Sequence, residues 1–352
     1  MSSNVPVRNR LWYWLRLAAI NIIVTTILLI LALVCVEVYM RATIPASSGG
    51  SLFESTTQTR RYKVMKPDTR IVAWGREFRT NRLGFRDNKL DIPVKQPAAF
   101  RAVVLGDSFT ASAGVDIDKI YPTLLQRRLE QSMPGAEVIN LAVGGYNIVQ
   151  YELVLAEVGL SLDPDLVIVA VFPFNDLSND TYRANRDDAL GRSIPSTPTP
   201  WYRRMYVYQA YLGRVEGRIR SWFASPPPSA GARASAQAIR ETDAEENLDA
   251  LTRLVQTAEN RGIQVVVALL PNTDSFEAQH EDFAPFEALC SREQWRCLNL
   301  LDRFMTIDDP PSSLRLNQLD PHPNERYNEL VAGFLGEYLL SHIERLKDSK
   351  SH

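Results

Sequence analysis

The sequence predicts an α/β fold built on a doubly wound parallel sheet and preceded by one transmembrane helix. From residue 100 onward, short apolar runs alternate with segments whose apolar residues recur at helical spacing, as in βαβ units. The run Leu166–Phe172 is continuously apolar and rich in β-branched residues, which suits a strand covered on both faces. Near the N-terminus, residues 17–36 contain no charge.

The uncharged segment has the length of a membrane span, because its twenty residues measure about 30 Å as a helix. Aromatic residues precede it at Trp12–Trp14 and follow it at Tyr39, as is typical of membrane interfaces. The sequence therefore predicts a transmembrane helix over residues 17–40 and a stub over residues 1–16.

The arginines around this segment predict its orientation. Three of them precede it, and only Arg41 lies close after it, so the positive-inside rule places the stub in the cytoplasm and the remainder outside. A cleaved signal peptide, a buried core helix and a lipoprotein anchored through Cys35 are the alternatives. The apolar run is longer than a signal peptide needs and lacks a small-x-small site, and bulky Val34 precedes the cysteine. We therefore expect a single-pass anchor.

The segment between the span and the α/β domain is polar. Residues 45–51 read PASSGGS, a composition typical of a flexible linker. Residues 52–97 mix charged and apolar side chains without a clear period. We therefore assign residues 41–97 to linker and lead-in, and the folded domain to residues 98–346.

Strands and helices are predicted in alternation within that domain. The expected strands are residues 102–105, 138–141, 166–172, 263–270 and 297–301. The expected helices are residues 121–133, 148–158, 248–258 and a segment that begins after Asn324. Asn324 can cap the last helix, and Gly262 stands where a left-handed residue commonly ends the third.

An insertion of about residues 177–240 separates the third and fourth expected strands. Its flanks, SIPSTPTP and SPPPSAGARAS, are rich in Pro and Ser, which is typical of mobile linkers. Its centre, residues 201–222, combines Trp, Tyr and Arg side chains. There we expect a helix that packs on the domain or lies near the membrane.

The composition excludes several classes of protein. The 39 Lys and Arg residues nearly balance the 41 Asp and Glu residues, so no basic excess indicates nucleic-acid binding. Three cysteines are too few for a disulfide-rich scaffold, and four histidines without metal-like spacing predict no metal site. In an exported domain Cys290 and Cys297 could form a disulfide, but two reduced thiols fit the sequence equally well.

Polar residues follow three of the expected strands, where ligands bind in such folds. Ser108 follows Gly106-Asp107 at a turn into a helix, which exposes its hydroxyl and places its N–H at a helix N-terminus. Gly145 lies in a Gly-Gly turn, where a backbone N–H can approach a ligand closely. Asn175 offers an amide donor. Each is an ordinary turn or cap when taken alone, and only their joint occurrence indicates a site.

A fourth polar block, Asp320-Pro-His322-Pro, precedes the last helix. Each proline disfavours the helical region for the residue before it, so Asp320 and His322 are expected to be extended. In an extended segment residues i and i+2 point the same way. The sequence therefore predicts that the imidazole and the carboxylate lie side by side, as a catalytic base and its carboxylate partner require.

These four blocks resemble, in order, those of the SGNH (GDSL-type) hydrolase family: GDSFT with Ser108, NLAVGGYN with Gly145, FPFND with Asn175 and DPHPN with His322. The resemblance covers about residues 100–345. It implies a flavodoxin-like three-layer α/β/α sandwich and ester hydrolysis or acyl transfer without metal or cofactor. It also implies that Ser108 is the nucleophile and His322 the general base. The implied oxyanion hole consists of the N–H groups of Ser108 and Gly145 with the amide of Asn175.

Two positions depart from the family's pattern. Pro173 stands where the family usually has Gly, two residues before Asn175, so we expect the loop around Asn175 to be shaped differently. The family's usual Asp lies three residues before the His, but Leu319 occupies that place and the carboxylate belongs to Asp320. Some extracytoplasmic relatives that act on polysaccharide acyl groups have this D-x-H arrangement. On that resemblance and the extended geometry, Asp320 is the candidate third catalytic residue.

The stretch TNRLGFRD, residues 80–87, resembles a segment that precedes the catalytic domain in membrane-anchored bacterial members of the family. The resemblance assigns it no role. Arg82 and Arg86 are candidates for binding an acidic substrate, although a solvated structural loop is the expectation.

Together these features predict an inner-membrane serine esterase with a periplasmic catalytic domain. Its expected substrates are acyl esters, acetyl-like, on envelope glycans or lipids, and its expected partners are the bilayer and envelope polysaccharide machinery. The sequence does not separate hydrolysis from transfer. The alternative is a non-catalytic glycan-binding or assembly subunit on the same fold. A flavodoxin-like phosphate or FMN site is disfavoured, because it leaves the placement of His322 unexplained.

Overall fold

A computed structural model describes residues 7–43, 52–97, 99–193, 200–208, 212, 215–216 and 230–348. The predicted linker at residues 45–51 and most of SIPSTPTP lie outside the described residues. The chain divides into two compact units. The first comprises Met1–Pro45 and Thr197–Ser225, and the second Ala46–Ser196 and Pro226–His352.

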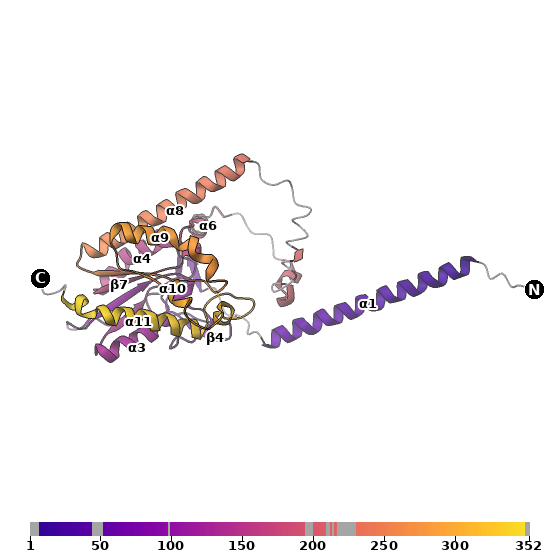
Figure 1. The fold of residues 1–352 in the computed structure, drawn as a ribbon, viewed down its shortest axis with the longest axis horizontal. Helices are drawn as coiled ribbons and strands as arrows, with labels where there is room; N and C mark the ends of the chain where they lie inside the picture. Colours follow the sequence, from indigo (N-terminus) through magenta and orange to yellow (C-terminus); the bar gives the residue numbers. More distant parts are fainter. Residues whose placement is uncertain are drawn as a thin grey trace, which may run out of the picture. The chain divides into compact units, whose positions relative to one another are not determined.

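The first unit contains the long helix α1 (Val7–Thr43) (Figure 1). Its segment Trp12–Thr43 is long and apolar enough to cross a membrane, and its apolar window is not buried in the protein. The predicted apolar N-terminal helix is confirmed as a helix. Length and composition alone do not separate a membrane anchor from a signal sequence.

The middle of the predicted insertion is bound to the end of α1 within this unit. Trp201–Arg204 forms a short turn of 3₁₀ helix (η2). The backbone N–H groups of Tyr206 and Val207 donate to the carboxylate of Glu37, at 3.1 and 2.9 Å. The guanidinium of Arg41 donates to the same carboxylate at 2.7 Å. These contacts satisfy a buried carboxylate that would otherwise interrupt an apolar helix.

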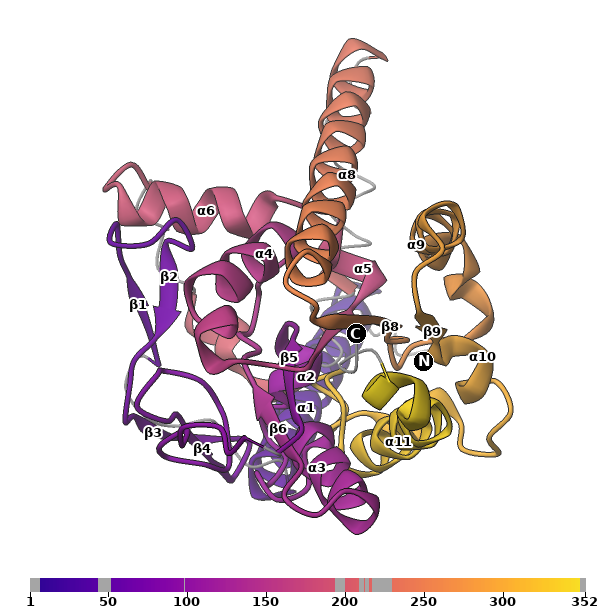
Figure 2. The same cartoon turned by 90° about the vertical axis from the view of Figure 1, so that its left-hand side faces the viewer.

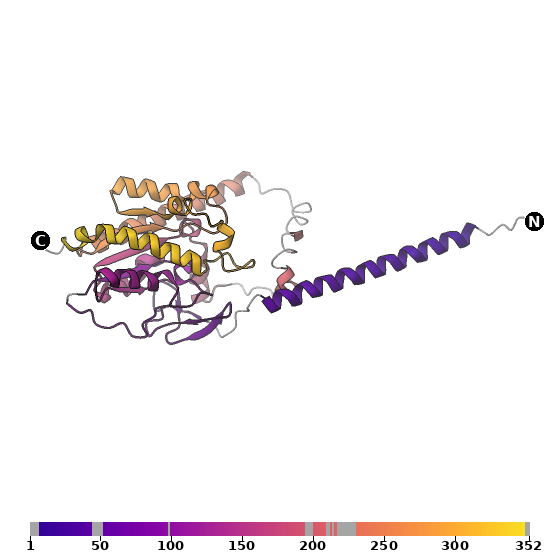
Figure 3. The same cartoon turned by 60° about the horizontal axis from the view of Figure 1, so that its bottom comes forward.

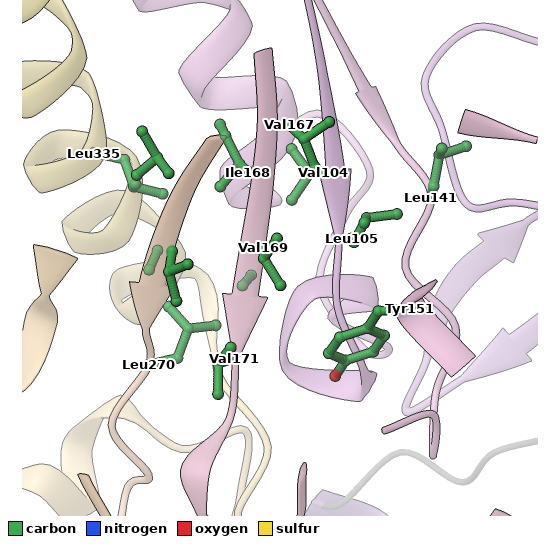
Figure 4. Close-up of a cluster of buried hydrophobic side chains, with 14 of the residues drawn as sticks. Val104, Leu105, Leu141, Tyr151, Val167, Ile168, Val169, Val171, Leu270 and Leu335 are labelled. Carbon is green, nitrogen blue, oxygen red and sulfur yellow. The ribbon is translucent and has the colours of Figure 1, made fainter. Parts of the chain in front are cut away.

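The second unit is built on a five-stranded parallel sheet with the order β6-β5-β7-β8-β9. The strands are β5 (Arg101–Leu105), β6 (Glu137–Asn140), β7 (Leu166–Val171), β8 (Gln264–Leu269) and β9 (Cys297–Asn299). Every residue of β5 and β7 is buried, which explains the continuously apolar sequence of β7 and of β5 after Arg101. Figure 4 shows the resulting core, in which Leu335 and Tyr151 from two helices pack with the strand side chains.

Helices cover both faces of this sheet (Figures 1 and 3). The helices α3 (Tyr121–Ser132) and α11 (Glu325–Asp348) pack against each other, and α4 (Ile148–Glu157) packs against α8 (Ala230–Glu259). The predicted three-layer α/β/α sandwich is therefore confirmed. Asn324 accepts the N–H of Tyr327 and caps α11, as predicted. Gly262, with φ at +72°, follows α8.

Five more helices lie in the described part of this unit. They are α2 (Ser108–Ala111), α5 (Pro173–Asp176), α6 (Asp180–Ala189), α9 (His280–Glu293) and α10 (Leu300–Phe304). Further 3₁₀ turns are η1 (Gly159–Leu162), η4 (Glu277–Gln279) and η5 (Pro311–Leu314). Cys290 in α9 and Cys297 in β9 form a disulfide. Of the two alternatives that the sequence left open, a disulfide or two reduced thiols, the structure has the disulfide.

Two predictions about element limits are corrected. The helix predicted from residue 248 begins at Ala230, so the end of the stretch SPPPSAGARAS is helical and not a linker. The fifth strand ends at Asn299, because α10 begins at Leu300 and is capped by the Asn299 side chain. The domain limits predicted from the sequence stay predictions.

The lead-in segment, residues 52–97, forms two antiparallel hairpins. One pairs β1 (Phe53–Ser55) with β2 (Lys63–Met65), and the other pairs β3 (Arg70–Ala73) with β4 (Arg76–Arg79). Figure 2 shows β1 and β2 next to α6, and β3 and β4 closer to α3. Strands of three or four residues are too short to produce a readable alternation, so the sequence did not reveal them.

Candidate active site

Ser108 lies just after the carboxyl end of strand β5, where it begins helix α2. Asp107 caps this helix, and its carboxylate accepts the N–H of Phe109 at 2.8 Å. A Cβ at Gly106 would lie 2.3 Å from Oγ1 of Thr110, so the turn requires glycine. The strand end and the cap together hold Ser108 at the edge of the sheet where ligands bind in this architecture.

A hydrogen-bonded series joins Ser108 to the block that precedes α11. Nε2 of His322 lies 2.9 Å from Oγ of Ser108. Nδ1 of the same ring lies 2.5 Å from Oδ1 of Asp320, which also accepts the backbone N–H of His322 at 3.0 Å. The predicted juxtaposition of Asp320 and His322 is therefore confirmed.

The turn before His322 explains how a carboxylate two residues away reaches the ring. The side-chain Oδ1 of Asn317 accepts the N–H groups of Leu319 and Asp320, at 2.8 and 3.1 Å. The N–H of Leu316 donates to the carbonyl of His322 at 2.7 Å. These bonds close a small loop around Asp320. A local turn thus accommodates the D-x-H spacing. Leu319, at the position of the family's usual Asp, contributes only its backbone N–H to this turn.

The electrostatics of the pair favour an imidazolium next to a carboxylate. Burial lowers the pKa of His322, but the hydrogen bond and the charge of Asp320 outweigh it, so this pKa lies above its ordinary value. Burial raises the pKa of Asp320, but its hydrogen bonds and the charge of His322 bring it below the ordinary value. The Asp320 side chain is 14% exposed and the His322 side chain 36%. The ring therefore stays accessible to solvent while the carboxylate is shielded.

The Gly-Gly turn after β6 approaches Ser108. A Cβ at Gly144 would lie 3.7 Å from the Cβ of Ser108, in ordinary contact. Gly145 has φ at +80°, a left-handed conformation that favours glycine. Asn147 then caps α4 by accepting the N–H of Gln150. The predicted oxyanion-hole residue Gly145 thus lies in the turn beside the serine.

Asn175 lies in the short helix α5, which follows β7. Pro173 is the first residue of this helix, a position that needs no N–H donor, so the departure from the family's glycine is accommodated. Nδ2 of Asn175 lies 3.4 Å from Oδ2 of Asp107, and its Oδ1 is buried without a partner. This long contact is a weak hydrogen bond for the Asn175 amide. The amide N–H groups can therefore donate to a negative charge that develops on a bound substrate.

Two buried carboxylates near the site were missed by the sequence analysis as site residues. Asp107 and Asp176 are fully buried, and burial raises the pKa of each above its ordinary value. Asp176 accepts the hydroxyl of Tyr151 and the N–H of Phe172. Asp107 could have been found as a helix cap directly before Ser108, whereas nothing local in the sequence marks Asp176 as buried.

Arg86 binds the C-terminal end of helix α2, which begins at Ser108. Its side chain is fully buried. Its guanidinium donates to the carbonyls of Ala111, Ser112 and Val115, at 2.7, 2.5 and 2.5 Å. These carbonyls end or follow α2, where a cation is favourable. Burial lowers the pKa of Arg86 to about 10, so the group keeps its charge at neutral pH.

The expectations for TNRLGFRD are therefore corrected for one of its arginines. Arg86 is neither solvated nor placed to bind a substrate, because its side chain is buried and its two terminal nitrogens donate to backbone carbonyls. Arg82 is exposed and pairs with Asp91 at 2.8 Å, as a solvated loop residue would. Within the same motif, Asn81 closes the turn by accepting the N–H groups of Leu83 and Phe85.

A cavity of about 540 Å³ lies beside α5, and residues of α8 complete its wall. Phe174 and Ile239 line it and are 65% and 53% exposed. Among the residues that the structure describes, no group of three or more His, Cys, Asp or Glu side chains could hold a metal ion.

The profile of the GDSL-like lipase/acylhydrolase family matches residues 104–330. The structure is similar to a GDSL-like lipase from Bacteroides thetaiotaomicron, at 13% identity and a TM-score of 0.40, over 72% of this chain and 92% of that one. It is similar to the lipase/acylhydrolase from Enterococcus faecalis, at 10% and 0.40, over 68% and 95%. It also resembles a two-domain esterase active on acetylated mannans, at 12% and 0.38, over 71% and 50%. No curated protein matches the chain.

Proposed function

The chain belongs to the GDSL-like lipase/acylhydrolase family, and on that premise we propose that it is a membrane-anchored, extracytoplasmic serine esterase acting on acyl esters of envelope glycans or lipids. The observation that carries this proposal is the hydrogen-bonded series from Ser108 through His322 to Asp320. The family match spans all three positions. A serine, a base and an orienting carboxylate in this order are the parts that nucleophilic ester cleavage needs.

In the proposed first step, His322 removes the proton from Ser108 as its oxygen attacks the ester carbonyl. The 2.9 Å contact between Nε2 and Oγ is within reach for this transfer. Asp320, held at 2.5 Å from Nδ1, fixes the ring and stabilises the imidazolium that forms. The alcohol leaves after receiving this proton, and an acyl-Ser108 ester remains.

The negative charge on the carbonyl oxygen would be met by three donors. These are the N–H groups of Ser108 and Gly145 and the side-chain amide of Asn175. A serine at the start of a helix presents its N–H at the positive end of the helix dipole. Loss of one such donor commonly raises the barrier by about 2.7–4 kcal/mol.

In the second proposed step an acceptor attacks the acyl-serine. Water gives hydrolysis, and a sugar hydroxyl gives acyl transfer. The partly exposed ring of His322 favours hydrolysis, because water can reach the base. The cavity beside α5 provides room for a part of the substrate beyond the reacting ester.

Two observations support the proposed location. The exposed apolar helix α1 has the length of a membrane span, and the following unit carries the Cys290–Cys297 disulfide. Disulfides persist in oxidising compartments such as the periplasm and are rare in the cytosol. The arginine asymmetry around α1 supports a cytoplasmic N-terminus and an enzyme domain on the outer side, by the positive-inside rule.

The decisive experiment uses the full chain in detergent micelles. A fluorophosphonate probe should label Ser108, and activated short-chain esters should be hydrolysed. Ser108→Ala should abolish both, whereas Ser161→Ala, which changes a serine in η1, should keep both. Incubation with acetylated polysaccharides, followed by mass analysis of released acid and acylated acceptor, separates hydrolysis from transfer. A wild-type protein that neither labels nor turns over would instead fit a glycan-binding or assembly subunit.

A further inference from the structure

The two loops that carry the proposed oxyanion donors Gly145 and Asn175 contact each other away from the reacting serine. The turn after β6 carries Gly145 and ends at Asn147, and the helix α5 carries Asn175 and is followed by Ser178. A Cβ at Gly145 would lie 3.5 Å from Cγ2 of Thr181, so the turn lies against the start of α6. The side chains in this contact are therefore placed to affect both donors.

The side-chain amide of Asn147 joins these loops. Its Nδ2 donates to the carbonyl of Ser178 at 2.8 Å and to Oδ1 of Asn179 at 2.7 Å. Its Oδ1 accepts the N–H of Gln150 and caps α4. Ser178 in turn donates its own N–H to the carbonyl of Asn175 at 3.0 Å. One buried side chain thus connects the end of the glycine turn to the residue that is bonded to Asn175.

Two more buried asparagines support this connection. Oδ1 of Asn179 also accepts Nδ2 of Asn247, in α8, at 3.0 Å, and Nδ2 of Asn179 donates to Glu246 at 2.7 Å. Oδ1 of Asn247 accepts the N–H of Val149, in α4, at 3.3 Å. We call Asn147, Asn179 and Asn247 the asparagine clamp, and each of them is at most 4% exposed.

The chemistry of the asparagine clamp suits a rigid connection inside the protein. An amide both donates and accepts, so the three side chains bond to one another without introducing a charge. The side-chain nitrogen and oxygen of all three are bonded, and a buried polar network that is satisfied in this way favours one arrangement of the segments it joins. The clamp therefore fixes the two loops relative to each other.

We propose that Asn147 is a positioning residue of the active site, whose amide sets the separation between the N–H of Gly145 and the side chain of Asn175. This inference rests on the proposed esterase function. The two donors follow β6 and β7, which are separated by β5 in the sheet, so no direct strand pairing fixes the distance between them. A misplacement of about 1 Å in a catalytic site can lower the rate about 100-fold. The asparagine of GGYN thus acts beyond capping α4.

The test replaces Asn147 by serine in the full-length protein in detergent. Serine caps a helix about as well as asparagine but has no amide N–H, so Asn147→Ser keeps the cap and removes both bonds to the second loop. It should lower kcat for an activated ester by roughly 10- to 100-fold with little change in KM, because the two donors act on the charge of the transition state. The matched control is Asn299→Ser, which makes the same change at the cap of α10 and should keep the wild-type rate.

A second variant keeps the test valid if the serine variant does not fold. Asn147→Asp has the size of the native side chain and also caps a helix well, but its carboxylate lacks the same N–H groups. It should show the same loss of kcat at nearly constant KM. Urea unfolding in detergent gives the folded fraction of each variant, so that rates are compared per folded molecule. A wild-type kcat in either folded variant would overturn the proposal.

A double-mutant cycle shows whether Asn147 acts through the oxyanion hole. In an Asn175→Ala background, Asn147→Ser should change kcat and the rate of fluorophosphonate labelling by less than about twofold. Equal losses in both backgrounds would show that the clamp only stabilises the fold, and would overturn the proposal. If Asn147→Ser keeps kcat while Ser108→Ala and Asn175→Ala lose activity, the proposed function holds and the positioning role alone fails. A Ser108→Ala variant that keeps its activity would overturn both.

Discussion

The α/β core and the lead-in segment both contact the candidate site, but they do so by different physical means. The core presents Ser108 and Asn175 at the ends of buried strands, where the backbone ladder sets their positions. The lead-in has only short hairpins, and it acts through single side chains that reach across to the core, as Arg86 does with three carbonyls.

One part of the candidate site is therefore held by the regular backbone hydrogen bonds of the sheet, and the other part by individual side-chain hydrogen bonds. The first part tolerates many changes on its surface, because the sheet as a whole holds it. The second part depends on a few donors, each of which is buried or has one defined partner. The two parts should therefore respond differently to substitution.

The largest effect is expected from the core half of the site. His322→Ala should lower kcat/KM for an activated ester by about 10⁴-fold or more, because it removes the group that takes the proton from Ser108. The matched control is His280→Ala, at an exposed position of α9, which should keep the wild-type rate. A variant of His322 that retains a tenth of the activity would show that another group is the base.

The next effect tests the lead-in half and uses two arginines of one motif. Arg86→Met should lower the free energy of unfolding by about 3–5 kcal/mol, because buried carbonyls lose their charged donor. Arg82→Met, at an exposed ion pair, should change it by less than about 0.5 kcal/mol. Urea unfolding in detergent measures both. Equal values for the two variants would mean that the lead-in is not held by this arginine.

A smaller effect is expected at the edge of the core farthest along the sheet from Ser108. Replacing Cys290 and Cys297 together by serine should lower the free energy of unfolding by roughly 2–3 kcal/mol, the stabilisation expected of a short disulfide loop. Esterase activity of the folded protein should be unchanged. Cys35→Ser, in the exposed apolar helix, serves as the control. Unchanged stability in the double variant would contradict the disulfide in the native protein.

The smallest expected effect is a shift in the pH dependence of kcat/KM. Activity needs the neutral imidazole, so kcat/KM should rise as pH rises through the pKa of His322. Since Asp320 holds this pKa above the ordinary value of about 6.5, the midpoint of the rise should lie above that pH. Asp320→Asn should move the midpoint to lower pH. A wild-type midpoint below about 6.5 would show that the pair does not interact as described.

The same division explains how much could be predicted from the sequence. The apolar run Leu166–Phe172 predicted a buried strand, and the two prolines around His322 predicted that Asp320 and His322 lie side by side. The structure has both features. Arg86 could not be placed in this way, because its partners are backbone carbonyls, which have no residue-specific signature.

The hairpins of the lead-in also have a consequence for the order in which the chain folds. Their strands are separated by short loops, so closing them costs little entropy, and they can form as soon as residues 52–79 are free. The carbonyls to which Arg86 donates come later in the chain, at residues 111–115. During synthesis the lead-in is therefore made before the residues to which its arginine binds. A chain truncated before residue 322 would lack the proposed base His322 and would therefore be inactive.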